Sequence, residues 1–209
     1  MNSYKLDIKL KDSLSFWLKE HKREIVLCLI SMLIGIVVGV IISFGDVNLY
    51  KLLTTGNENL YAFISGTAEL NVIFWQRLFV GLFGAALIII FSLSFYSSFL
   101  GFAYLSYQTA VFVLAIVAII EYYSLGEIIF CVVMLIPTNL LLLSCLGLLQ
   151  ANCHKRAKDV HHFQMQFTKS FTKEFWISTA ILVIFYLLVQ ILINLFVPMI
   201  LRAIYVINY

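Results

Sequence analysis

Long apolar stretches alternate with short polar segments along this chain. The first stretch, residues 25–44, carries no charged side chain. At ~1.5 Å rise per residue, a helix of this length crosses a hydrocarbon core of ~30 Å. The residues Ser43-Phe44-Gly45 resemble a weak signal-peptide cleavage site, but the apolar part of a signal peptide is only about 7–15 residues long. We therefore interpret residues 25–44 as a retained transmembrane helix.

The next apolar stretch is too long for one helix. Residues 78–120 contain no charge, and a single helix of that length would reach ~65 Å, about twice the thickness of the hydrocarbon core. A serine-rich interval between Ser92 and Gly101 weakens the stretch, so we expect the chain to turn there. The sequence predicts an all-α protein with five transmembrane helices at about 25–44, 78–98, 101–120, 128–149 and 175–201.

The basic residues indicate how these helices are oriented. Residues 1–24 hold six Lys or Arg and residues 152–174 hold five, whereas residues 45–77 hold two. Basic segments stay on the cytoplasmic side, so an even number of helices must separate residues 1–24 from residues 152–174. Four helices satisfy this condition. We therefore predict a cytoplasmic N-terminal segment, a basic cytoplasmic loop at 152–174 and an extracytoplasmic tail at 202–209. The segment 45–77 would be extracytoplasmic, with short amphipathic helices on the membrane surface.

Composition agrees with a multi-pass membrane protein. The 209 residues are 62% hydrophobic and only 12% charged, with a mean hydropathy of +0.99. Soluble proteins carry about 25% charged residues. The net charge of +3 is too small to indicate a nucleic-acid partner. Cys28, Cys131 and Cys145 lie within apolar stretches, which favours buried thiols over a disulfide framework.

The sequence lacks recognisable catalytic chemistry. None of the predicted spans contains Asp, Glu, Lys, Arg or His, which disfavours an ion-coupled transporter. Nucleotide-binding, zinc-protease and serine-hydrolase motifs are also absent. Two pairs of adjacent residues suggest a metal site, namely Cys153 with His154 and His161 with His162. Their spacing does not suit tetrahedral zinc. We favour the alternative that these residues belong to a basic loop that faces lipid headgroups. We expect no catalytic residue, metal, cofactor or small-molecule substrate.

Small residues recur every four positions in the first span. Ser31, Gly35, Gly39 and Ser43 would share one helix face, which we call the small-residue face. Helices in lipid associate closely through such faces. The face could bind another subunit or pack inside this bundle, and we favour packing inside the bundle.

Polar residues within two later spans suggest further contacts between helices. Pro137 would kink the fourth span, and Asn139 beside it can satisfy freed backbone groups or bond to a neighbouring helix. This site could be a structural kink, a hinge or a docking site for a partner. Gln190 and Asn194 share a face of the fifth span and are expected to hydrogen-bond between helices.

Short motifs along nearly the whole chain resemble those of the stage II sporulation protein M family. They are Leu-Lys-Glu-His at 18–21, Ile-Gly-Ile-Val-Val-Gly at 34–39, Asn-Leu-Tyr-Ala-Phe-Ile at 59–64, the Pro-Thr-Asn stretch at 135–143 and Asn-Leu-Phe-Val-Pro at 194–198. Ser144 stands where that family has a second proline, so the chain resembles a divergent member.

This resemblance implies a non-enzymatic scaffold in the bacterial cell membrane. In the family, the protein acts during engulfment with stage II sporulation proteins D and P, which cut peptidoglycan. The alternative is a permease subunit that works with a separate ATPase docked on the basic loop at 152–174. The lipid bilayer is the partner common to both hypotheses.

Overall fold

Helices make up almost all of the described structure. The structure, a computed structural model, describes residues 16–45, 70–122, 125–162 and 173–208, and these contain no strand. The long helices within them are α2 (Lys22–Gly45), α4 (Leu70–Phe91), α5 (Phe95–Tyr122), α6 (Leu125–His162) and α8 (Lys173–Asn208). Each is long and apolar enough to cross a membrane. For the described residues, this confirms the predicted all-α architecture with five helices that are long and apolar enough to cross a membrane.

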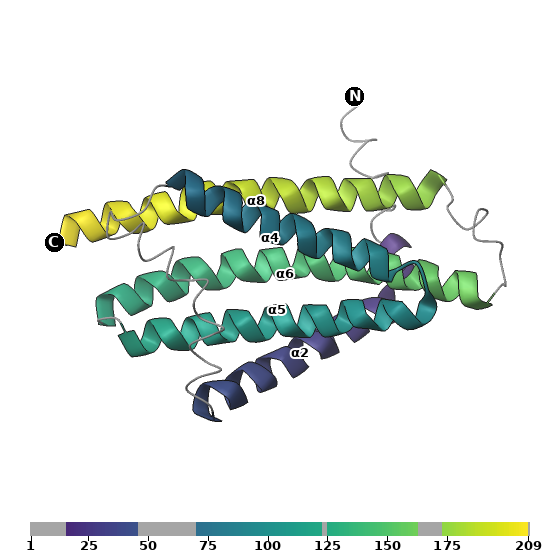
Figure 1. The fold of residues 1–209 in the computed structure, drawn as a ribbon, viewed down its shortest axis with the longest axis horizontal. Coiled ribbons are helices and arrows are strands. Elements are labelled where there is room, and N and C mark those ends of the chain that lie inside the picture. Colours follow the sequence, from purple (N-terminus) through teal and green to yellow (C-terminus); the bar gives the residue numbers. More distant parts are fainter. Residues whose placement is uncertain (1–15, 46–69, 123–124, 163–172, 209) are drawn as a thin grey trace.

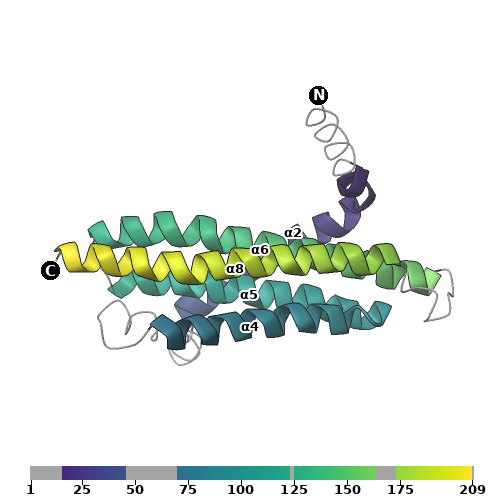
Figure 2. The ribbon, with the colours of Figure 1, turned by 90° about the horizontal axis from the view of Figure 1, so that it is seen from above.

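The helices run side by side in alternating directions (Figures 1 and 2). The α6 helix is central, since it packs against α2, α4, α5 and α8. The α2 helix crosses α5 obliquely on one side, and α8 packs on α4 and α6 on the other (Figure 1). The start of α2, the turn between α4 and α5, and the end of α6 lie at one end of the bundle. We call this the charged end, comprising residues 16–24, 92–95 and 150–162.

Serine side chains stabilise the turn between α4 and α5. Residues 92–94 form this turn, inside the serine-rich interval where a break is expected. The last carbonyls of a helix have no donor within the helix. Ser92 Oγ donates to the carbonyl of Ile89 at 2.6 Å, and Ser97 Oγ donates to that of Phe91 at 2.6 Å. The Ser97 hydroxyl thus supplies a donor to the Phe91 carbonyl, and the Ser92 hydroxyl adds a second donor to the Ile89 carbonyl, which also accepts from the Ser92 N–H at 3.1 Å.

The helices extend beyond the apolar stretches. The α6 helix continues to His162, so the prediction of a loop is wrong for residues 152–162. The α8 helix likewise includes most of the expected tail, and α4 begins at Leu70, within the expected outer segment. Hydropathy marks where a helix leaves hydrocarbon, whereas backbone hydrogen bonding and packing decide where it ends. The remaining expected surface helices fall on residues 46–69, outside the described residues.

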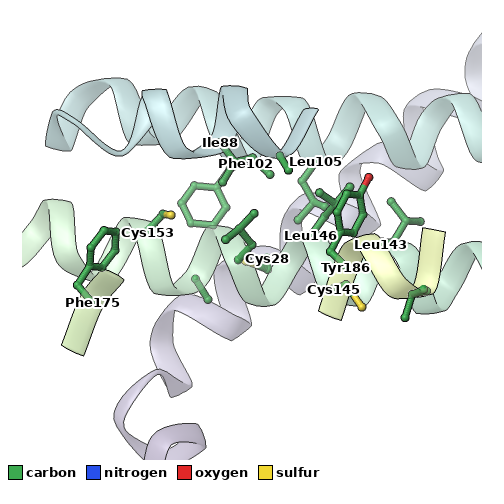
Figure 3. Close-up of a cluster of buried hydrophobic side chains, with 14 residues drawn as sticks. Cys28, Ile88, Phe102, Leu105, Leu143, Cys145, Leu146, Cys153, Phe175 and Tyr186 are labelled. Carbon is green, nitrogen blue, oxygen red and sulfur yellow. The ribbon is translucent and has the colours of Figure 1, made fainter. Parts of the chain in front are cut away.

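A hydrophobic cluster fills the space between α6 and its neighbours (Figure 3). Ile88, Leu105 and Leu149, from three helices, have no exposed surface. Cys28 and Cys145 are buried free thiols, as the sequence indicates. The Cys28 thiol donates to the carbonyl of Gly147 at 3.2 Å and so links α2 to α6.

Candidate functional site

The small-residue face of α2 packs against α5 of the same chain. Ser31, Gly35 and Gly39 are buried, whereas Ser43 is partly exposed and bonds to its own helix. A Cβ atom added to Gly39 would lie 2.9 Å from the carbonyl oxygen of Ala110 in α5. The face therefore serves packing inside the bundle at its three buried positions. A loss of partner binding in Gly39→Leu would consequently not identify a partner surface, because the same change damages this internal contact.

The buried stripe on α2 extends beyond the small residues. Cys28 is buried one turn before Ser31 and Glu24 two turns before it, and His21 is buried at the start of the stripe. Spacing of three or four residues keeps these side chains on one helix face. Sequence reasoning missed this continuation because it searched for small residues, and Glu24 is large and charged.

The two predicted kink residues both lie within α6. Pro137 lies inside α6 with its side chain exposed, and Asn139 is half-buried. Both readings of this site, as a structural kink or as a hinge or docking site, stay predictions.

Gln190 and Asn194 face the bundle interior from α8. Both are buried, and the Gln190 amide occupies the space where a Cβ on Gly81 of α4 would lie. Tyr186, one turn earlier, donates its hydroxyl to the Gly81 carbonyl at 3.4 Å. Among the described residues, Gln190 Oε1 and Asn194 Nδ2 have no hydrogen-bond partner. Gln190 therefore packs closely on α4, whereas the expected hydrogen bond between helices stays a prediction.

A polar cluster on the second half of α6 joins three helices. We call it the α6 polar cluster, and its members are Ser98, Gln150, Asn152, His154 and Thr179. Gln150 Nε2 donates to the Ser98 carbonyl at 2.8 Å, and His154 Nδ1 lies 2.7 Å from Ser98 Oγ. Asn152 Nδ2 donates to Thr179 Oγ1 at 3.1 Å. Residues 150 and 154 face α5 and residue 152 faces α8, as helical periodicity requires.

Sequence reasoning missed this cluster because Gln150 to His154 follows the apolar part of α6 and reads as the start of a loop. The available signal was the polarity itself. Five consecutive residues without charge, three of them polar, are typical of a partly buried helix as well as of a loop.

Ser98 and His154 resemble a nucleophile paired with a base, but their hydrogen bonds indicate a structural role. Ser98 Oγ donates its single proton to the Phe95 carbonyl at 2.6 Å. The contact with His154 must then be a bond donated by Nδ1–H to Oγ. A general base needs an unprotonated nitrogen facing the hydroxyl. Ser98 is also only 1% exposed, so a substrate cannot reach it.

Aromatic rings enclose His154. The rings of Phe95, Phe99 and Phe102 lie 5.7, 5.2 and 4.9 Å from its ring centre. His154 is thus buried on a helix and does not face headgroups from a loop, which corrects that expectation. Within the described part of the chain, no three His, Cys, Asp or Glu side chains are grouped to hold a metal ion.

Two ion pairs join Glu20 and Glu24, just before and at the start of α2, to the last part of α6. Lys155 pairs with Glu20, and this hydrogen bond lowers the pKa of the Glu20 carboxyl. Lys158 Nζ lies 3.6 Å from Glu24 Oε1. These contacts bring the two basic segments of the sequence to the same end of the bundle.

His21 packs against Trp17 at the charged end, next to these ion pairs. Its ring stacks on Trp17 at 4.1 Å, and Nδ1 donates to the Trp17 carbonyl at 2.9 Å. Burial lowers the pKa of His21 and outweighs the opposing effect of this hydrogen bond. His21 is therefore held neutral near pH 7, and its role is packing.

Replacing Ser98 by alanine should destabilise the bundle by about 1.5 kcal/mol, because the change leaves the buried His154 N–H without an acceptor. Thermal unfolding of the purified variant in detergent measures the effect. Ser144→Ala is the matched control, since the Ser144 hydroxyl bonds to the Leu140 carbonyl of its own helix on an exposed face of α6. Equal stability of both variants would contradict a structural role for the Ser98–His154 contact.

Comparison with known proteins adds no relative: no protein family, curated protein or solved structure matches this chain. Function is therefore inferred from the bundle and from the motifs of the sequence.

Proposed function

We propose that this protein is a non-enzymatic scaffold of a bacterial cell membrane that recruits peptidoglycan hydrolases during engulfment, in the manner of the family it resembles. One observation supports a scaffold, namely the closed interior. Ile88, Leu105 and Leu149 are fully buried in the cluster around α6, and Leu114 is fully buried between α2 and α5. Close packing of this kind holds helices in one arrangement and leaves their outer faces to partners.

We place the N-terminus in the cytoplasm and the C-terminus outside. The Glu20–Lys155 and Glu24–Lys158 pairs support this orientation, because they bring both basic segments to one end. By the positive-inside rule that end faces the cytoplasm. The segment 45–77 then faces the extracytoplasmic side, where stage II sporulation proteins D and P act in the resembled family.

A permease subunit is less well supported. An ATPase would dock on the basic part of α6, but Lys155 and Lys158 are engaged by glutamates of the same chain. A permease also needs a helix that moves relative to its neighbours. The central α6 instead packs on α2, α4, α5 and α8.

Capture of partners from the native host tests the scaffold. The tagged chain, solubilised in mild detergent from stationary-phase cells, should retain membrane-anchored peptidoglycan hydrolases detectable by mass spectrometry. Replacing residues 46–69 with a Gly/Ser segment of equal length should abolish their capture. The same replacement at 163–172, on the opposite side of the membrane, should leave it intact. Recovery of a cytoplasmic ATPase without any wall hydrolase would contradict the proposal and favour the permease.

A further inference from the structure

A groove of about 560 Å³ opens at the charged end, between α2, α5 and α6. Its size lies within the range of small-molecule sites, which is roughly 300–1,000 Å³. Its charged lining includes Lys22, Arg23 and Lys158, and its apolar lining includes Val26, Leu27 and Phe95. The groove shares His154 with the α6 polar cluster, but the other four members of that cluster do not line it.

The charged part of the groove is positive overall. Glu24 is its carboxylate, and Lys158 pairs with it. Lys22 and Arg23, at the start of α2, are both exposed. Within the described residues neither side chain belongs to an ion pair, so both can contact an anion that enters the groove.

The apolar part begins one helical turn further along α2. Val26 and Leu27 are 46% and 38% exposed on the bundle surface, and both lie in the stretch that is apolar enough to cross the membrane. At ~1.5 Å per residue, Val26 lies about 6 Å deeper than Lys22. Cations at the membrane boundary followed by apolar surface match the order of groups in a phospholipid, whose phosphate precedes its acyl chains.

We propose that this groove binds an anionic phospholipid. Lys22 and Arg23 bind the lipid phosphate and the charged headgroup, and an acyl chain lies along Val26 and Leu27 against Phe95. In the orientation proposed above, the groove opens to the cytoplasmic leaflet, where anionic lipids attract basic side chains. The lipid would also contact the ion-paired region between α2 and α6, and so hold these helices together at the boundary.

Native mass spectrometry of the purified full chain tests this proposal. The probes are dioleoyl phosphatidylglycerol, which is anionic, and dioleoyl phosphatidylcholine, which has the same chains and no net charge. The wild type should retain phosphatidylglycerol preferentially. Lys22→Gln and Arg23→Gln should each weaken this retention about fivefold. Lys19→Gln removes an exposed cation outside the groove and should change it less than twofold.

A second pair of variants tests the apolar part without altering charge. Leu27→Trp fills the groove and should reduce phosphatidylglycerol retention at least fivefold. Leu29→Trp, on a more exposed face of α2 outside the groove, should have no effect. Because each variant has its matched control, a folding defect in one pair leaves the other pair decisive.

Four results would overturn the lipid site: equal retention of the two lipids, an equal loss in Lys19→Gln, an unchanged Leu27→Trp, or displacement of lipid by millimolar inorganic phosphate, which would indicate a free-anion site. Lipid selectivity of the purified chain does not involve partner proteins. Its failure can therefore be distinguished from failure of the scaffold proposal.

Discussion

Gly35→Leu is expected to destabilise the bundle by ~3 kcal/mol, the largest effect of any single substitution considered. A Cβ at this position would overlap the carbonyl oxygen of Ser106 and lie 2.8 Å from Thr109 Cβ. Neither atom is the flexible end of a side chain, so α2 and α5 must move apart. The Ser106 hydroxyl, which donates to the Ser31 carbonyl at 2.7 Å, would lose its bond as well.

Thermal unfolding in detergent measures this effect, with an expected decrease in Tm of roughly 10 °C. Gly45→Leu is the matched control on the same helix, because a Cβ at Gly45 has no atom within 4 Å. Its Tm should stay within about 2 °C of the wild type. Similar Tm values for both variants would show that α2 does not pack closely on α5 through its small-residue face.

Lys158→Met is expected to have the second-largest effect, about 2 kcal/mol. The Glu24 side chain is only 6% exposed, and the substitution removes the cation that pairs with its buried carboxylate. The loss of stability would be larger if both side chains of the pair were buried. The Lys158 side chain is 32% exposed, so water can solvate the remaining Glu24 carboxylate in part and reduce the loss. Methionine retains most of the apolar stem, so the loss reports mainly on charge.

Lys155→Met provides the comparison. Its partner Glu20 is 49% exposed, and an ion pair of that kind contributes less than about 1 kcal/mol. Adding Glu24→Gln to Lys158→Met should restore most of the lost stability, because the buried charge is then removed. An equal loss in the two lysine variants, or no recovery in the double variant, would contradict burial as the cause.

The sequence predicted the helical spans well because a bilayer imposes a strong constraint. Each crossing needs about 20 apolar residues, so the charge-free run at 78–120 could only be two helices. The numbers of Lys and Arg in the polar segments between the spans supplied an independent check on the number of spans. Neither argument reports where a helix ends outside the bilayer, which is why the continuation of α6 to His162 was missed.

Contacts between helices were harder to predict than the spans. Membrane helices are apolar on all sides, so polarity does not indicate which face is buried. The small residues of α2 were a usable signal, but nothing in the sequence named α5 as their neighbour. The Ser98–His154 contact joins residues 56 positions apart. Such a pair is visible only when the turn at residues 92–94 and the full length of α6 are known.

Reporter fusions at two positions test the proposed scaffold topology most directly. Alkaline phosphatase is active only outside the cytoplasm, and green fluorescent protein fluoresces mainly inside it. With a cytoplasmic N-terminus and five crossings, a phosphatase fused after Tyr209 should be active, and a fluorescent protein inserted at 163–172 should fluoresce. A fluorescent fusion after Tyr209 with an inactive phosphatase there would contradict this topology. Segment 45–77 would then lie in the cytoplasm, where it could not recruit wall hydrolases.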